Sequence, residues 1–284
     1  MTPPSRKFHI KRTLAHPFFL VSVFWLLSSG CTVQSSTSNH YLTAEKLWTE
    51  KNYPAAVVEF DHVVKESPNS GIGLQALWRA SMTRSLFLNE PEEALRGFET
   101  FIERASSSEL APQAQQEIGE IYFSKMAQYQ KALDFYQKLL ESKKFAPDDE
   151  AKFMYRIARS NFLLGRIRRS IEWLEKVCVQ FPNSPVVDKA QFDLANAWYA
   201  LGEGEKGAYP KAQAMFHALA EKTRAKNHTL SVESVFGEAS TLEELDKLEE
   251  AYELLKTIQN DYPAPNVIKL RMASIEERKK KKHK

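Results

Sequence analysis

A small residue followed four positions later by a large apolar one recurs six times along this chain. The pairs are Ala56/Phe60, Ala94/Phe98, Ala132/Tyr136, Ser170/Leu174, Ala212/Phe216 and Ala251/Leu255. Successive small residues are 38, 38, 38, 42 and 39 positions apart. A nearly fixed period of this size predicts stacked helical repeats, each burying its apolar face against its neighbours. Such stacks usually bind other molecules along an extended concave surface.

Each interval predicts a helix–turn–helix unit. In the fourth, we expect a first helix over 150–164, a break at Gly165, and a second helix over 167–180 that ends before Pro182. The small residue is expected where two helices cross closely, and the large residue fills the space between neighbouring units. Glycine is scarce, with 10 in 284 residues, which also favours helix.

These features resemble the tetratricopeptide repeat (TPR). The shared features are the Ala-x-x-x-Phe pairs, the proline that ends a unit, and the aromatic residues Tyr53, Tyr129 and Tyr209 near the start of the second helix. The period of about 38 is longer than the 34 residues of the family. The resemblance implies an all-α, right-handed TPR superhelix, or α-solenoid. It would comprise about six repeats over 41–265, then a capping helix and a basic tail within 266–284.

Residues 1–30 have the layout of an export signal. Bases from Arg6 to Arg12 precede an apolar stretch over 18–27 and a few small residues. That stretch is about half of the ~20 residues that a membrane-spanning helix needs. The layout resembles a bacterial lipoprotein signal peptide, which implies cleavage before Cys31 and attachment of acyl chains such as palmitate to it. Ordinary secretion, with Ser28 and Gly30 before the cut, and an uncleaved anchor are the alternatives.

Residues 31–40 are rich in Ser and Thr, and they predict a flexible tether. Ten bases lie in the signal or in the run 278–284, so 31–277 holds 29 basic and 36 acidic residues. This mildly acidic body argues against nucleic acid as a partner. The basic run predicts a tail that frays into solvent, or alternatively one that contacts anionic lipid.

The connectors at 67–70, 181–185 and 262–265 resemble the Phe/Tyr-Pro-Asn-Ser-Pro connectors of envelope TPR proteins. The closer resemblance is to the lipoprotein of the outer-membrane β-barrel assembly machine (BamD-like). It implies a non-catalytic scaffold, anchored in the outer membrane and facing the periplasm. Its partners would be other envelope proteins or unfolded outer-membrane proteins. One alternative is a Tol–Pal or cell-wall coordinating protein, and another is an accessory subunit of an envelope enzyme.

The TPR register places a peptide-binding groove on the first helices of repeats four and five. The candidate groove residues are Lys152, Tyr155, Arg159, Phe162, Lys189, Phe192, Asn196 and Tyr199. Aromatic and basic side chains in this pattern suit an extended peptide that offers carboxylate or backbone acceptors.

We expect no cofactor, no metal and no catalytic site. The letters Gly202 to Gly207 fit a dinucleotide fingerprint, but they join two helices where that motif needs a strand, so we predict a lengthened turn. The seven His lack metal-ligand spacing. Cys178 is expected on the inner face of a helix as a small apolar group.

Overall fold

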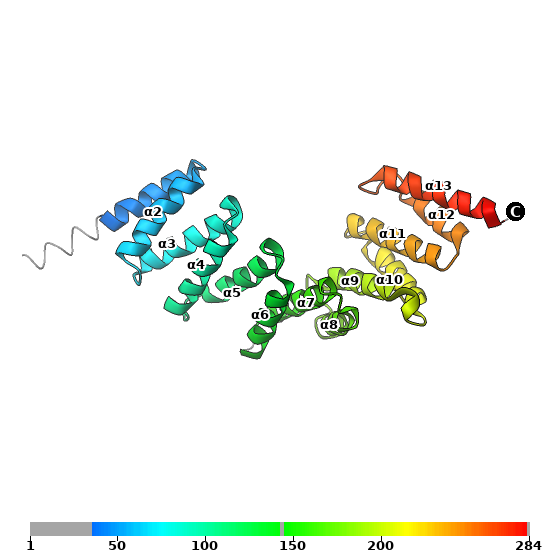
Figure 1. Ribbon diagram of the computed structural model, residues 1–284, viewed down its shortest axis with the longest axis horizontal. Helices are drawn as coiled ribbons and strands as arrows, with labels where there is room; N and C mark the ends of the chain where they lie inside the picture. Colours follow the sequence, from blue (N-terminus) through cyan, green and yellow to red (C-terminus); the bar gives the residue numbers. More distant parts are fainter. Residues whose placement is uncertain (1–35, 143–144, 283–284) are drawn as a thin grey trace, which may run out of the picture. The chain divides into compact units, whose positions relative to one another are not determined.

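The computed structural model describes residues 36–142 and 145–282. The expected signal peptide and Cys31 lie outside these residues. All regular structure within the described stretches is helical, as Figure 1 shows, so the predicted all-α repeat fold is confirmed. The chain divides into two compact units, Met1–Ile118 and Gly119–Lys284.

The first unit begins with a helix over 36–49, followed by α2 (Tyr53–Glu66), α3 (Gly71–Thr83), the π-helical turn η1 (Arg84–Leu88) and α4 (Pro91–Arg104). Helix α5 (Ala111–Glu120) includes the boundary between the units. Helix α2 packs on α3, and α3 packs on α4. From α2 to α4, consecutive helices therefore contact one another, as expected for helix–turn–helix repeats.

The second unit continues with η2 (Ile121–Lys125), α6 (Tyr129–Ser142), α7 (Pro147–Leu163), α8 (Ile167–Gln180) and α9 (Val187–Leu201). It ends with η3 (Gly202–Gly204), α10 (Ala208–Thr223), α11 (His228–Glu244), α12 (Leu248–Thr257) and α13 (Pro265–Lys282). Helices α7 and α8 match the two helices predicted for the fourth repeat to within three residues. The short 3-10 helix η3 belongs to the lengthened turn predicted between α9 and α10.

The six periodic pairs lie on α2, α4, α6, α8, α10 and α12, the second helices of the repeats. Every one of the twelve side chains is at most 1% exposed. In two of the pairs the large residue packs directly on the backbone of a glycine. A Cβ atom added to Gly119 would lie 2.3 Å from the Tyr136 ring, and one added to Gly237 would lie 2.6 Å from the Phe216 ring, so neither position has room for a side chain. The pairs therefore mark close helix contacts, as predicted.

The turn inside each repeat has a second periodic feature, found five positions before the small residue. The residue there has a positive φ in all six repeats, with values from 51° to 82°. These residues are Lys51, Asn89, Ala127, Gly165, Gly207 and Asp246. Only two are glycine, so four turns hold a side chain in the left-handed region, which costs about 1–2 kcal/mol per residue.

A π-helical turn ends the first helix of the second and third repeats, where η1 follows α3 and η2 follows α5. A π-helical turn contains more residues than an α-helical one. These turns are therefore one physical source of a period longer than 34.

The predicted flexible tether is wrong for residues 36–40, which belong to the helix over 36–49. Polar partners on α2 fix this segment: Thr37 Oγ1 donates to Glu66 Oε2 at 2.8 Å, and His40 Nδ1 lies 2.5 Å from Glu59 Oε2. Thr37 is 1% exposed. The polar composition alone indicated a linker. The hydrogen-bond partners that make this segment helical lie some 20 to 30 positions away, so local composition could not reveal them.

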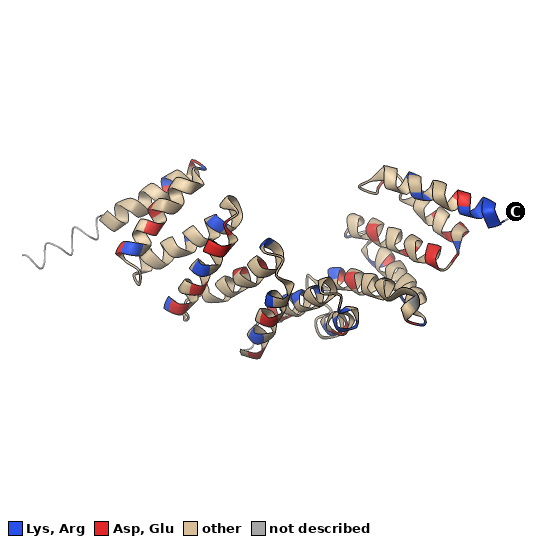
Figure 2. Ribbon diagram, viewed as in Figure 1, with Lys and Arg blue, Asp and Glu red and all other residues tan. Residues whose placement is uncertain are grey.

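The expectation of a fraying basic tail is wrong for residues 278–282, where α13 stays helical. Figure 2 shows the cluster of bases at its end. Arg278 pairs with Glu243 at 3.4 Å, Lys279 pairs with Glu249 at 3.4 Å, and Lys282 pairs with Asp246. Ile268 and Ile275 of α13 are fully buried beside α12, as predicted for a capping helix.

None of the described helices combines the length and apolar character that crossing a membrane requires.

Candidate functional site

The first helices of repeats four, five and six, α7, α9 and α11, form the walls of a groove. Helix α9 contacts both α7 and α11. A wide cavity of about 560 Å³ is lined by Arg159 of α7, by Lys189 and Phe192 of α9, and by Leu230 and Glu233 of α11. This cavity is partly open to solvent.

A narrow cavity of about 310 Å³ adjoins the wide one. Its lining residues come from α7, α8 and α9: Arg159, Phe162, Ser170, Phe192, Asp193, Asn196, Tyr199 and Ala200. Arg159, Phe192 and Asp193 line both cavities. We call the two cavities together the first-helix groove.

An ion pair fixes the junction of the two cavities. Asp193 is 8% exposed, and its carboxylate accepts from Tyr155 Oη at 2.5 Å and from Arg159 Nη1 at 3.1 Å. Burial, and then the negative charge of Asp193, raise the pKa of Tyr155, so the phenol keeps its proton and remains a donor. The Arg159 guanidinium is thus held at one point while about a third of its side chain stays exposed.

Aromatic side chains flank this ion pair. Tyr199 Oη donates to Glu244 Oε1 of α11 at 3.2 Å, and Phe192 meets Phe216 edge-on with ring centres 5.8 Å apart. Asn196 donates to the Phe192 carbonyl oxygen at 3.0 Å, within its own helix. These contacts fix the side-chain positions in the groove before any ligand arrives, which lowers the entropy cost of binding.

Six of the eight predicted groove residues line the first-helix groove, and two do not. Those that line it are Arg159, Phe162, Lys189, Phe192, Asn196 and Tyr199. The Tyr155 side chain is 4% exposed, and its hydroxyl donates a hydrogen bond to Asp193. Lys152 lies in the second turn of α7, pairs with Asp149 of the first turn at 3.3 Å, and is not among the residues that line the two cavities. The expectation that the Tyr155 side chain faces the groove is wrong because it is buried, and the role of Lys152 stays a prediction.

Sequence reasoning missed Asp193, Ser170 and Glu233 in the groove. The signal for Asp193 was its spacing of 38 residues from Tyr155, close to one repeat, which predicts that the two lie on neighbouring first helices. Glu233 lies 44 residues beyond Lys189. That spacing matches none of those between successive periodic pairs, so the sequence pattern gave no signal for Glu233.

A second contact also recurs between successive first helices. In it, an arginine forms an ion pair with a glutamate and stacks on an aromatic ring. In the first unit Arg79 of α3 makes two bonds of 2.7 Å to Glu45, and its guanidinium carbon lies 4.4 Å from the Trp48 ring centre. In the second unit Arg156 of α7 bonds Glu120 at 2.6 and 2.7 Å and lies 4.5 Å from Phe123. Two-pronged bonds with ring stacking hold neighbouring repeats in register.

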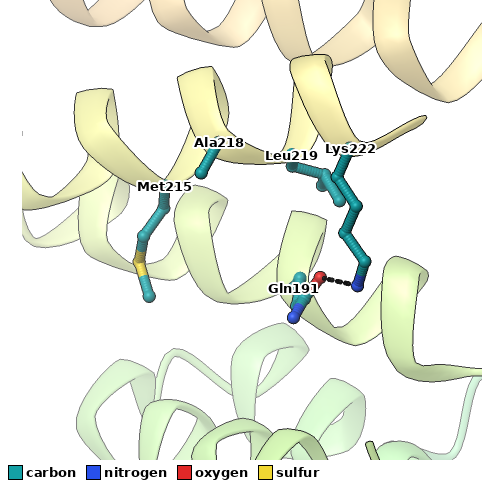
Figure 3. A pocket seen from close by; sticks show the side chains of 5 residues that line it. All are labelled: Gln191, Met215, Ala218, Leu219 and Lys222. Carbon is teal, nitrogen blue, oxygen red and sulfur yellow. Dashed lines mark hydrogen bonds between the residues drawn. The ribbon is translucent and has the colours of Figure 1, made fainter. Parts of the chain in front are cut away.

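A smaller hollow of about 180 Å³ opens between α9 and α10 (Figure 3). Apolar Met215, Ala218 and Leu219 line it, and Lys222 closes one end by donating to Gln191 Oε1 at 2.7 Å. Its lining contains no aromatic side chain, and its one charged group, Lys222, is already hydrogen-bonded. The groove is therefore the better candidate site.

The described residues include neither a metal-binding group nor a cysteine with a lowered pKa. Within 36–142 and 145–282, no three His, Cys, Asp or Glu side chains are grouped to hold a metal ion. Cys178 is a free, half-buried thiol beside the core of the fourth repeat, and burial raises its pKa to about 11. A thiol with that pKa stays protonated near neutral pH and is a poor nucleophile.

Known proteins support the repeat assignment. Residues 112–145 and 153–184 each match a tetratricopeptide repeat family model. A search of curated proteins finds no match.

Several solved structures are similar in fold. A tetratricopeptide repeat protein from Parabacteroides merdae has a TM-score of 0.61 at 12% identity, over 87% of this chain and 89% of its own. PilF from Pseudomonas aeruginosa has a TM-score of 0.54 at 11% identity, over 86% and 99%. MamA from Desulfovibrio magneticus has a TM-score of 0.51 at 15% identity, over 68% and 97%. The chain therefore contains tetratricopeptide repeats and has the all-α fold of that family of protein-binding scaffolds.

Proposed function

We propose that this chain is a non-catalytic scaffold that holds an extended segment of a partner protein in the first-helix groove. The observation that carries the proposal is the position of Arg159. Asp193 fixes its guanidinium at the junction of the two cavities, and part of it remains exposed to a ligand. An arginine held in this way donates to backbone carbonyls or carboxylates at little entropic cost.

The charged side chains along the groove suit a segment that carries both hydrogen-bond acceptors and hydrogen-bond donors. Lys189 is exposed, and its Nζ lies 5.9 Å from the Tyr155 ring centre. Glu233 stands on α11 at the other wall of the wide cavity. Between them Phe192 offers an apolar surface. An extended chain would meet a donor, an apolar contact and an acceptor in succession.

We further propose that the scaffold works in the bacterial cell envelope, held to the outer membrane by acyl chains on Cys31 and facing the periplasm. The support is the signal layout of residues 1–30 and the resemblance of the Pro-Asn connectors to those of envelope TPR proteins. In this account the groove receives other assembly subunits or unfolded outer-membrane proteins. Two acyl chains or more are needed for stable attachment.

The proposal is tested by recovering partners from detergent-solubilised envelopes with the full-length chain tagged at its C-terminus. Lys189→Glu and Arg159→Gln alter the groove, and Arg169→Glu on the exposed side of α8 is the matched control. Cys31→Ala tests the anchor. We expect the groove variants to lose the partner that the wild type and Arg169→Glu recover, and Cys31→Ala to become soluble.

Equal recovery by folded groove variants and by the wild type would remove the groove from the proposal. Recovery of Tol–Pal or cell-wall proteins in place of β-barrel assembly subunits would replace the assembly role. A wild type that fractionates as a soluble protein would remove the lipid anchor.

A further inference from the structure

Among the described residues, three acids line the wide cavity of the first-helix groove, and two of them are paired with bases. Asp193 pairs with Arg159 at 3.1 Å, and Asp188 lies 2.8 and 2.6 Å from two lysines near the end of α10. The Glu233 carboxylate forms neither an ion pair nor a hydrogen bond with any residue of the described stretches. Glu233 therefore carries an uncompensated negative charge in this cavity.

Lys189 also lines the wide cavity, but it is directed toward α7, since its Nζ lies 5.9 Å from the Tyr155 ring centre. Glu233 stands on α11, which α9 separates from α7 in the row of first helices. The Glu233 side chain is half-buried, so its carboxylate is partly removed from water. A cation that arrives with a ligand would replace the lost hydration with a charge-assisted hydrogen bond.

The chain itself shows which cation suits a glutamate beside a ring. Three arginines each pair with a glutamate and stack on an aromatic ring of the preceding first helix. Two of them are Arg79 and Arg156. The third is Arg271 of α13, which bonds Glu243 of α11 at 2.5 Å and has its guanidinium carbon 5.0 Å from the Phe236 ring centre. In each case one planar guanidinium satisfies the carboxylate and the ring together.

The wide cavity offers a glutamate and a ring to which no arginine of the described chain is bound. Glu233 lines it from α11, and Phe192 lines it from the neighbouring α9. The arginine in its lining, Arg159, is already held by Asp193. The cavity of about 560 Å³ is partly open to solvent, so a long side chain of another molecule can enter it.

We propose that the wide cavity is a subsite for an arginine side chain of the bound partner segment. The guanidinium would pair with the Glu233 carboxylate and stack on the Phe192 ring. The inference rests on the proposed function, since it names one residue of the segment that the groove would hold. Lysine could form the ion pair, but its compact ammonium lacks the planar surface that stacks on a ring and the fork that bonds a carboxylate twice.

The test uses the full-length chain and three capped alanine pentapeptides, with arginine, lysine or the neutral isostere citrulline at the centre, in ligand-observed NMR titrations. We expect the arginine peptide to bind roughly three- to thirtyfold more tightly than the citrulline peptide, the range that an ion pair and a cation–π contact supply together. The lysine peptide should lie between them. Glu233→Gln should weaken the arginine peptide and leave the citrulline peptide unchanged. The matched control Glu172→Gln, which removes an exposed acid of α8 outside both cavities, should change neither.

Equal affinity of the arginine and citrulline peptides for the wild type would overturn the subsite, as would failure of all three to bind the folded chain. An arginine preference that survives Glu233→Gln would overturn the role of Glu233, and a lysine peptide as tight as the arginine peptide would overturn the stacking on Phe192. None of these results bears on partner recovery by the groove variants Lys189→Glu and Arg159→Gln. The subsite can therefore fail while the proposed function stands, and loss of the function would be seen separately.

Discussion

Arg159 on α7 and Asp193 on α9 join two successive repeats through a bond of 3.1 Å, and Tyr155 completes the cluster from the α7 side. The same three residues thus connect the packing of the repeats to the candidate groove. Asp193 is nearly buried while Arg159 is a third exposed, so the carboxylate acts as the fixed member.

Removal of Asp193 should destabilise the second unit. In Asp193→Ala, Tyr155 keeps a buried hydroxyl without an acceptor and Arg159 loses its partner. We expect the free energy of unfolding to fall by about 1–3 kcal/mol. The control is Asp149→Ala, which breaks the exposed pair with Lys152 and should cost at most about 0.5 kcal/mol. Urea unfolding measures both, and equal effects of the two variants would contradict the assigned role of Asp193.

The left-handed turn residues give predictions of opposite sign. Ala127 has φ of 51°, so Ala127→Gly should stabilise the chain by about 1 kcal/mol, because glycine adopts this conformation without strain. Gly165 has φ of 74°, so Gly165→Ala should destabilise by about 1–2 kcal/mol. Ala273→Gly, at an exposed helical position of α13, is the control and should destabilise by about 1 kcal/mol. Thermal melting of the three variants would contradict the account if Ala127→Gly and Ala273→Gly shifted the midpoint in the same direction.

The contact between His40 and Glu59 predicts a pH dependence of the first unit. The hydrogen bond that the His40 ring donates to Glu59, and then the charges of Glu59 and Glu66, raise the pKa of His40 above 6.5, although burial opposes this. A raised pKa in the folded state stabilises the protein fully below the unfolded pKa of about 6.5. That contribution is lost as the pH rises through the folded value.

We therefore expect the melting temperature of the wild type to fall as the pH rises above about 6.5, and His40→Gln to lack this step. His62, whose ring stacks on His40 with centres 5.2 Å apart, provides the comparison variant His62→Gln, which keeps the Glu59 contact. Identical pH profiles for the wild type and His40→Gln would refute the assignment.

Cys178 should react slowly while the chain is folded. Burial raises the pKa of its thiol to about 11, so little thiolate is present at pH 8. In a Cys31→Ala background, iodoacetamide should modify Cys178 far more slowly in the folded chain than in the chain unfolded in concentrated urea. Equal rates in the two conditions would show that the thiol is not buried as described.

The periodic pairs made the repeat fold predictable, because burial at close helix crossings imposes residue size directly on the sequence. The turn at Gly165 was visible for a different reason, because glycine ends helices and adopts the positive φ found there. Lys51 and Ala127 adopt a similar conformation although their residue types do not favour it, so the backbone around them sets their φ. Asn89 and Asp246 are of types that enter the left-handed region more readily.

The groove could be predicted in part. Helical register placed Arg159, Phe192 and Asn196 on one face, and the structure gathers them. The orientation of the Tyr155 side chain was not predictable from helical register. A tyrosine at the edge of a groove turns inward only where a buried acceptor is present, and here that acceptor, Asp193, lies on another helix. The same reason explains residues 36–40, whose helix depends on distant partners on α2.

The measurement that most directly tests the central claim is photo-crosslinking from single positions. A photoreactive amino acid would replace Asn196 in the first-helix groove or, as the control, Arg169 on α8, in the full-length chain within cell envelopes. The account predicts a partner adduct from position 196 and none from position 169. Adducts from position 169 alone, with both variants folded, would contradict it.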